Sequence, residues 1–148
     1  MIVKAAIRVR PAKDRDWPRV EEIERLCFPS HPWDREALRK YECLVAVFRA
    51  QITGFLSCRT LVRPDEEAGG EFEILNLAVD PVCRRMGVAK ALLHHQLARG
   101  GEHFLEVRES NAAARKLYES MNFRVIGTRR EYYTNPEETA IVMKWKLC

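Results

Sequence analysis

One strand–helix–strand segment constrains the fold more than any other part of the chain. Glu71–Val79 predicts a strand whose second half is apolar on both faces except at Asn76, which is typical of a central strand covered on both sides. Val88–Arg99 has apolar residues at helical spacing, and His103–Arg108 predicts a second strand. A strand, a helix and a strand in this order indicate a right-handed crossover between two parallel strands.

The flanking sequence predicts shorter elements around this segment. Helices are expected after Asp16, after Asp34 and after Asn111, three residues of types that favour helix N-caps. Alternating or apolar runs predict further strands at residues 7–10, 43–48, 52–61, 123–132 and 139–146, with turns at residues 49–51 and 135–136. The order predicts an α+β fold in three layers: a mixed, mostly antiparallel sheet with helices on both faces, in one domain spanning residues 1–148.

Composition excludes several classes of protein. Hydrophobic residues make up 47% of the 148, too many for a disordered chain and enough for a core without metals or disulfides. The net charge of +4 is mild and no apolar run is long enough to span a bilayer, so we expect neither nucleic acid nor membrane as a partner. Five cysteines without a C-x-x-C or Cys/His cluster predict reduced thiols, no metal site and a cytoplasmic protein.

The loop between the central strand and its helix carries the clearest chemical signal. It places Gly87 in the first turn of the helix, where backbone N–H groups lack internal partners and favour an anion. Gly87 and Ala89 would let a phosphate approach the backbone, and Arg84, Arg85 and Lys90 add positive charge. Neither a Walker A nor a G-x-G-x-x-G motif is present. The residues alone leave a phosphate site and an ordinary strand–helix turn equally open.

Two motifs give the chain a resemblance to the GNAT superfamily of N-acetyltransferases. Arg84–Ala89 resembles its Q/R-x-x-G-x-G/A signature, and residues 105–123 are similar to the L-E-V-R-x-S-N-x-x-A…L-Y-x-x-x-G-F block of the RimI-type branch. Asn122 stands where that block has glycine, and asparagine tolerates the left-handed conformation expected there. The resemblance implies the GNAT fold, with the sheet splayed at its central parallel pair, and acetyl-CoA as cosubstrate without a metal.

The resemblance also implies which residues hold acetyl-CoA. Backbone groups of the central strand would pair with the pantetheine arm, the signature loop would cradle the pyrophosphate, and Asn111 would contact the coenzyme while capping a helix. The positions concerned are Leu77, Ala78, Val79, Arg84, Arg85, Met86, Gly87, Val88, Ala89, Lys90 and Asn111. For the three strand residues, the alternative is an ordinary core strand.

Glu106 lies inside an otherwise apolar strand, where a carboxylate needs either a charged or hydrogen-bonding partner or a catalytic role. The residues leave two roles open: general base for an acceptor amine, or a buried pair with an arginine such as Arg108. Tyr118, two helical turns after Asn111, is expected either as the acid that protonates the departing thiolate or as a packed aromatic. In other branches of the superfamily a glutamate on the strand before the signature loop is the base, so the resemblance makes Glu73 a second candidate for that role. It is otherwise a solvated residue.

The sequence gives a less specific signal for the residues that would bind the acceptor of the acetyl group. In the family, the regions that hold four aromatic residues of this chain lie beside the acceptor, so each is expected as either core or acceptor wall. Together with Glu73, the expected substrate-binding residues are Phe28, Trp33, Tyr132 and Tyr133.

The expected activity is transfer of an acetyl group from acetyl-CoA to a protein N-terminal α-amine, as RimI-type enzymes perform on a ribosomal protein. An α-amine, with a pKa of about 8, is easier to deprotonate than a lysine amine, with a pKa of about 10.4. A single carboxylate base therefore suits an α-amine better. The alternatives are acetylation of a small-molecule amine and a non-catalytic coenzyme-binding module.

Overall fold

The structure is a computed structural model that describes residues 6–30, 32–134 and 136–147. Its seven strands are β1 (Arg8–Pro11), β2 (Glu42–Phe48), β3 (Gln51–Val62), β4 (Glu71–Val79), β5 (Glu102–Arg108), β6 (Arg124–Tyr133) and β7 (Glu138–Lys146). Four α-helices accompany them: α1 (Trp17–Cys27), α2 (Arg35–Arg39), α3 (Val88–Leu97) and α4 (Ala112–Ser120). Short 3₁₀ helices occupy η1 (Asp14–Asp16) and η2 (Pro81–Cys83).

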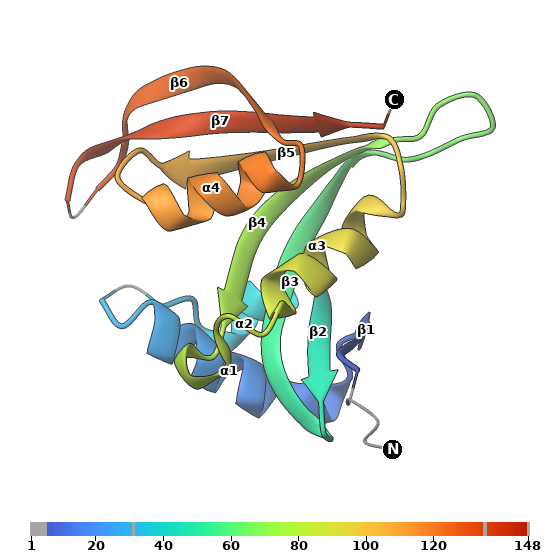
Figure 1. Ribbon diagram of the computed structural model, residues 1–148, viewed down its shortest axis with the longest axis vertical. Helices are drawn as coiled ribbons and strands as arrows, with labels where there is room; N and C mark the ends of the chain where they lie inside the picture. Colours follow the sequence, from blue (N-terminus) through green and yellow to red (C-terminus); the bar gives the residue numbers. More distant parts are fainter. Residues whose placement is uncertain (1–5, 31, 135, 148) are drawn as a thin grey trace. The chain divides into compact units, whose positions relative to one another are not determined.

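The strands form one sheet in the order β1-β2-β3-β4-β5-β7-β6 (Figure 1). β4 pairs with β5 in parallel from Glu71↔Glu102 to Ile74↔Leu105. The pairs β1–β2, β2–β3, β5–β7 and β6–β7 are antiparallel. The predicted element order, the parallel crossover and the α+β class are therefore confirmed. The chain divides into two compact units, Met1–Arg59 with Asn76–Ala98 and Thr60–Leu75 with Arg99–Cys148, each of which is described by itself below.

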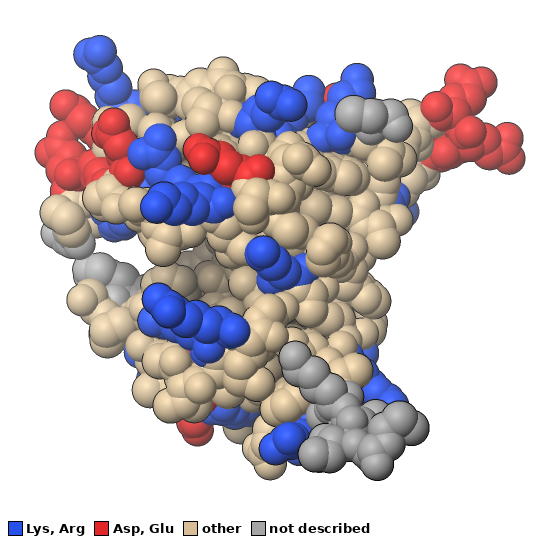
Figure 2. Space-filling model, viewed as in Figure 1, with Lys and Arg blue, Asp and Glu red and all other residues tan. Residues whose placement is uncertain are grey.

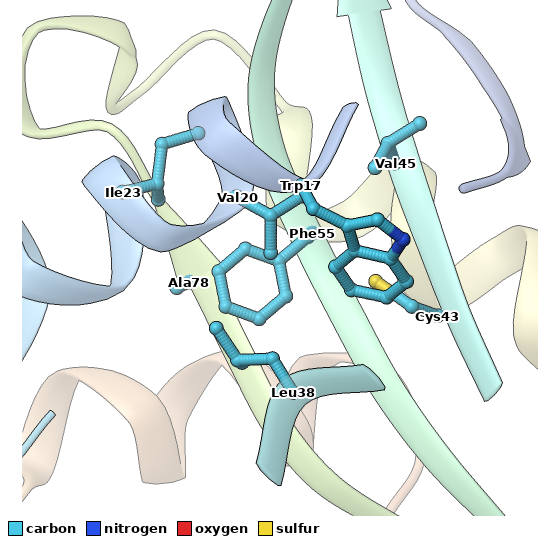
Figure 3. Close-up of a cluster of buried hydrophobic side chains, with 8 residues drawn as sticks. All are labelled: Trp17, Val20, Ile23, Leu38, Cys43, Val45, Phe55 and Ala78. Atoms are coloured by element: carbon cyan, nitrogen blue, oxygen red, sulfur yellow. The ribbon is translucent and has the colours of Figure 1, made fainter. Parts of the chain in front are cut away.

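In the first unit, one face of the sheet carries a cluster of buried hydrophobic side chains. Trp17, Val20 and Ile23 of α1 pack on this face with Phe55 of β3 (Figure 3). The other members of the cluster are Leu38, Cys43, Val45 and Ala78. Burying aliphatic and aromatic side chains of this size stabilises a fold by about 1.5–3 kcal/mol each, so this cluster holds α1 and α2 on β2 and β3.

The opposite face of β3 is covered by α3. Gly54 points away from Phe55 because side chains alternate along a strand. A Cβ at Gly54 would lie 2.9 Å from Val88 Cγ1 and 2.7 Å from the carbonyl oxygen of Ala78, so only glycine allows this approach. Helices therefore lie on both faces of this unit, as the sequence predicts.

The second unit contains the other hairpin and α4, and the loop 63–70 enters it from β3. Asp65, Glu66 and Glu67 are exposed in this loop, and Figure 2 shows acidic side chains gathered at its tip. The Asp65 carboxylate accepts from the backbone N–H groups of Glu67 and Ala68, which holds this part of the loop in a tight turn. The predicted turn residue Asn135 lies outside the described residues.

Some predicted boundaries and one cap were wrong. Helix α3 ends at Leu97, two residues before the predicted end. Asp16 precedes α1 as expected, but its side chain does not cap that helix. It pairs with Arg10 at 2.6 Å and accepts from the Lys13 backbone N–H at 2.7 Å, because η1 comes first and draws the carboxylate back toward β1.

Four cysteines are free thiols in the structure: Cys27, Cys43, Cys58 and Cys83. Cys148 lies outside the described residues. Among the described helices, none has both the length and the apolar character to cross a membrane.

Candidate active site

The loop after β4 is held in place by an ion pair. Asp80 accepts from the Val82 backbone N–H at 3.0 Å and from the Arg19 guanidinium of α1 at 2.5 Å. The hydrogen bond from Arg19 holds the pKa of Asp80 below its usual range, so this carboxylate stays charged at neutral pH. The pair fixes the point from which the chain enters η2 and the signature loop.

Gly87 is the N-cap of α3, whereas the sequence placed it inside the first turn. Its backbone is left-handed, at φ 84° and ψ 16°, and no side chain caps the helix from this position. Arg85, two residues earlier, also has a positive φ of 65°. A Cβ at Gly87 would meet no atom within 4 Å, so the space beside the start of α3 is open. An uncapped helix start with open space beside it fits an anionic group.

The other residues of this loop that were predicted to bind the coenzyme differ in their exposure to solvent. Arg84, Arg85 and Lys90 are exposed and basic, and Met86 is 41% exposed. Val88 is buried beneath Gly54, and Ala89 is half-buried. The basic side chains and the backbone are therefore the parts available to a ligand.

At the end of β4, one backbone carbonyl already accepts a hydrogen bond from a side chain. Ala78 is buried, while Leu77 and Val79 are half-buried. The Val79 carbonyl accepts from the Cys27 thiol at 3.2 Å, and Arg84 Nη2 lies 3.9 Å from the same sulfur. Burial raises the pKa of the Cys27 thiol. A carbonyl oxygen has two lone pairs, so the Cys27 thiol by itself does not saturate the Val79 carbonyl.

A buried carboxylate in α1 was missed by the sequence reasoning. Glu24 is 1% exposed and accepts from Asn76 Nδ2 at 2.6 Å and from the Trp33 backbone N–H at 2.9 Å. A signal was available, because Glu24 occupies the helical stripe that also contains Val20, Ile23 and Cys27. A charged residue on the inward stripe of a helix needs a buried partner.

In the second unit, Glu106 pairs with an arginine, as one of its two predicted roles requires, but Arg108 was the wrong arginine. The Glu106 side chain is 16% exposed, and its Oε1 accepts from Arg129 Nη1 at 2.7 Å rather than from Arg108. The register explains the pairing: Glu106 and Gly127 both lie opposite Val142 of β7, and Arg129 follows Gly127 by two residues. Sequence distance does not reveal this neighbour, because β7 lies between the two strands.

Arg108 has a different task, at the end of β5. Its guanidinium donates to the carbonyl oxygens of Pro136 at 3.0 Å and Thr134 at 3.2 Å, and it pairs with Glu138 at 3.4 Å. The same guanidinium stacks 4.4 Å over the Tyr133 ring. Arg108 therefore ties the β6–β7 turn to β5.

The two tyrosines of β6 adjoin Glu106. Tyr132 is 45% exposed, and the Arg129 guanidinium lies 4.4 Å over its ring. A side-chain hydrogen bond with Glu106 raises the pKa of Tyr132. Tyr133 is half-buried, and burial together with the charge of Glu106 raises its pKa to about 12. Their rings meet edge to face at 5.0 Å.

Glu73 is half-buried on the same side of the sheet. It pairs with Phe104 in the parallel register, and Glu106 lies two residues beyond Phe104, so both carboxylates point to one face. The hydrogen bond with Glu106 is the main cause of the raised pKa values of Arg129 and Tyr132, and the charge of Glu73 adds to both. This face of the unit thus carries two carboxylates with one guanidinium beside them.

Tyr118 is 9% exposed, and its ring contacts Phe123 edge to face at 5.7 Å. Burial raises the pKa of its hydroxyl to about 12, so the hydroxyl keeps its proton at neutral pH. Asn111 caps α4 as predicted, accepting from the Ala114 backbone N–H at 3.1 Å, and it remains exposed. Asn122 has a φ of 72°, which confirms the expected left-handed position.

The remaining two aromatics lie in the first unit. Phe28 caps the end of α1 and is 39% exposed. Trp33 is half-buried, packs against the hydrophobic cluster and meets Tyr41 at 6.0 Å. Within the described ranges, no group of three or more His, Cys, Asp or Glu side chains has a metal-binding arrangement.

Comparison with known proteins shows what this arrangement resembles. Residues 12–123 match the model of the Acetyltransferase (GNAT) family. A relative from Haemophilus ducreyi, named ribosomal protein bS18-alanine N-acetyltransferase, is 36% identical over 143 residues, covering 88% of this chain and 93% of that protein.

Solved structures agree with the sequence match. The ribosomal-protein-S18-alanine N-acetyltransferase from Escherichia coli has a TM-score of 0.79 at 29% identity, covering 97% of this chain and 96% of that one. NAA60 of Arabidopsis thaliana, solved in complex with acetyl-CoA, has a TM-score of 0.83 at 23% identity over 96% of this chain and all of that one, a likeness of fold. The chain belongs to the GNAT family of acetyltransferases.

Proposed function

We propose that this protein transfers the acetyl group of acetyl-CoA to the α-amine of a protein N-terminus, with a ribosomal protein beginning with a small residue as the acceptor. The observation that carries the proposal is the geometry of the Arg84–Lys90 loop in a chain of this family. The relative from Haemophilus ducreyi, which matches this chain over 93% of its own length and whose name specifies a ribosomal-protein alanine, supports the acceptor class.

Acetyl-CoA fits the residues of the first unit. Its pyrophosphate would accept from the uncapped N–H groups at the start of α3, beside Gly87 and the exposed basic side chains. Backbone groups of Leu77, Ala78 and Val79 would pair with the pantetheine arm. Asn111 belongs to the second unit and is proposed separately as an amide contact to the coenzyme. Peptide N–H and C=O groups are suited to the amides of that arm.

The reaction needs no covalent enzyme intermediate. The neutral acceptor amine attacks the thioester carbonyl carbon, a C–N bond forms and the C–S bond breaks, leaving an amide and the coenzyme thiol. Glu106 takes the proton released by the amine, through a water, and Tyr118 gives its proton to the departing sulfur. The pKa of about 12 keeps Tyr118 protonated, as a general acid requires.

The acceptor-side residues are Phe28, Trp33, Tyr132, Tyr133 and Glu73. The exposed rings would contact the first side chains of the acceptor peptide, and Glu73 adds negative charge near Glu106 for the acceptor ammonium. We also propose that residues 1–148 act as one domain, because the matched family model takes in residues of both compact units.

The test is an acetylation assay with peptides of matched sequence. One set has a free N-terminal Ala or Ser, and the other has a blocked N-terminus and an internal lysine. Transfer to the free α-amine is expected. Modification confined to lysine refutes the proposal, turnover of a polyamine alone supports a small-molecule enzyme, and acetyl-CoA binding without any turnover supports a non-catalytic module.

A second assay tests the base. Glu106→Gln is expected to lower kcat by about 10²-fold, with the Kd for acetyl-CoA near that of wild type. Unchanged kcat would transfer the role to Glu73 or to water.

A further inference from the structure

We propose that Arg129 is a positioning residue for the base, holding the Glu106 carboxylate in one orientation while its own guanidinium is braced on the Tyr132 ring. The inference rests on the proposed function, in which Glu106 takes the acceptor proton.

The contacts form a closed triangle of side chains. Arg129 Nη1 donates to Glu106 Oε1 at 2.7 Å, the Arg129 guanidinium lies 4.4 Å over the Tyr132 ring, and Tyr132 hydrogen-bonds with Glu106. Each side chain is therefore fixed by the other two. A guanidinium is planar and does not lose its proton near neutral pH, so it orients a carboxylate without competing for the transferred proton.

The backbone of β6 is shaped to make this triangle. Arg129 pairs with Ala140 and Tyr133 with Glu138, so residues 130–132 lie opposite the single residue Thr139. Within this bulge Glu131 has a left-handed φ of 53°. In a regular strand, residues three apart point to opposite faces. The bulge instead turns Tyr132 toward Arg129, and bulges commonly re-aim side chains in this way.

Stability alone does not account for the pair. The Arg129 side chain is 56% exposed, whereas that of Glu106 is 16% exposed. Exposed ion pairs contribute little to folding because solvent screens them. Orientation of a mostly buried carboxylate is a separate effect, since a small misplacement of a catalytic group lowers the rate far more than it lowers stability.

Glu73 is a second negative charge that interacts with the Arg129 guanidinium. The charges of Glu106 and Glu73 both act on Arg129, and both acids share one face of the sheet. Without the guanidinium, Glu73 would repel Glu106 and favour other side-chain rotamers of the base.

The test compares Arg129→Ala with Arg130→Ala, its exposed neighbour on the same strand. We expect Arg129→Ala to lower kcat about tenfold or more while the Kd for acetyl-CoA and the Tm stay near wild type. Arg130→Ala should retain wild-type kcat. Arg129→Lys should recover part of the rate, and added guanidinium should partly rescue Arg129→Ala because the site is open to solvent.

A double variant separates positioning from an independent role. Since Arg129 acts through Glu106, Glu106→Gln with Arg129→Ala should be no slower than Glu106→Gln alone. Wild-type kcat in Arg129→Ala, or fully additive losses in the double variant, would overturn the positioning role. Full activity of Glu106→Gln would instead overturn the assignment of the base, so the two failures are distinguishable.

Discussion

The side-chain amide of Asn76 donates a 2.6 Å hydrogen bond to the buried carboxylate of Glu24. The other carboxylate oxygen accepts from the Trp33 backbone N–H, so one side chain of α1 connects β4 with the segment that precedes α2. Burial raises the pKa of Glu24, and the two hydrogen bonds lower it by less. The two hydrogen bonds therefore hold the Glu24 carboxylate in place, although burial disfavours its charged form.

The raised pKa of Glu24 gives a signed dependence of stability on pH. A carboxyl group whose pKa is higher in the folded state contributes stability that is present below the unfolded value of about 4.3 and is lost as pH rises through the folded pKa. Glu24→Gln removes this titration. The Tm of wild type minus that of the variant should therefore fall as pH rises from about 4.3, as thermal melts can measure. A difference that is constant with pH would contradict the buried ionisation.

Asp16 should show the opposite sign. The hydrogen bond from Arg10 lowers its pKa, so its contribution is present above the unfolded value of about 3.9 and is lost as pH falls through the folded pKa. Asp16→Asn should cost on the order of 1–2 kcal/mol in the free energy of unfolding at pH 7, and less below about pH 4. Urea unfolding at both pH values checks this, and an equal loss at both would rule out the ion pair as the cause.

The sequence predicts the elements well where local signals agree. β4 was predicted with its observed bounds because its apolar run ends at Asp80-Pro81, and Asn111 was correctly placed as the α4 cap. Asp16 was misplaced because a 3₁₀ turn competes for its side chain, and sequence spacing does not distinguish the two caps. Local signals therefore fix where an element lies more reliably than what its boundary side chains bind.

The active-site residues were less predictable. Glu106 was recognised from its apolar strand, but its partner Arg129 depends on the register of three strands. The bulge that aims Tyr132 has Glu131 at its left-handed position, where a glycine would have given a signal. Long-range pairing and local backbone strain are both set by tertiary packing, which single-sequence patterns do not contain.

Gly87→Ala should weaken coenzyme binding without a steric cost inside the protein. A left-handed φ of 84° costs alanine about 1–2 kcal/mol relative to glycine, while its Cβ would meet no protein atom within 4 Å. The methyl group would project into the open space beside the α3 N-terminus. We expect a higher Kd for acetyl-CoA in calorimetry and a modest loss of Tm.

Gly54→Ala is the matched comparison, because its cost is steric. Its Cβ would lie 2.7 Å from the Ala78 carbonyl oxygen, so the larger loss of Tm is expected there. Equal coenzyme affinity of Gly87→Ala and wild type would contradict the anion site at α3.

Tyr118→Phe should lower kcat about tenfold, since a thiolate is already a fair leaving group. Its hydroxyl has a pKa of about 12 and stays protonated throughout an assay between pH 6 and 9. The ratio of wild-type to variant kcat should therefore be constant over that range. A ratio that changes between pH 6 and 9 would contradict a Tyr118 hydroxyl that stays protonated over that range.

Glu131 tests whether the bulge in β6 matters for the reaction. Glycine accepts a φ of 53°, so Glu131→Gly should keep the bulge, the Arg129–Tyr132 stack and wild-type kcat. Valine is strained at positive φ, so Glu131→Val should straighten the strand and turn Tyr132 away from Arg129. Its kcat should fall toward that of Arg129→Ala, whereas Arg130→Val, at a residue without positive φ, should keep wild-type kcat. Equal kcat values in Glu131→Gly and Glu131→Val would show that the orientation of Glu106 does not depend on this bulge.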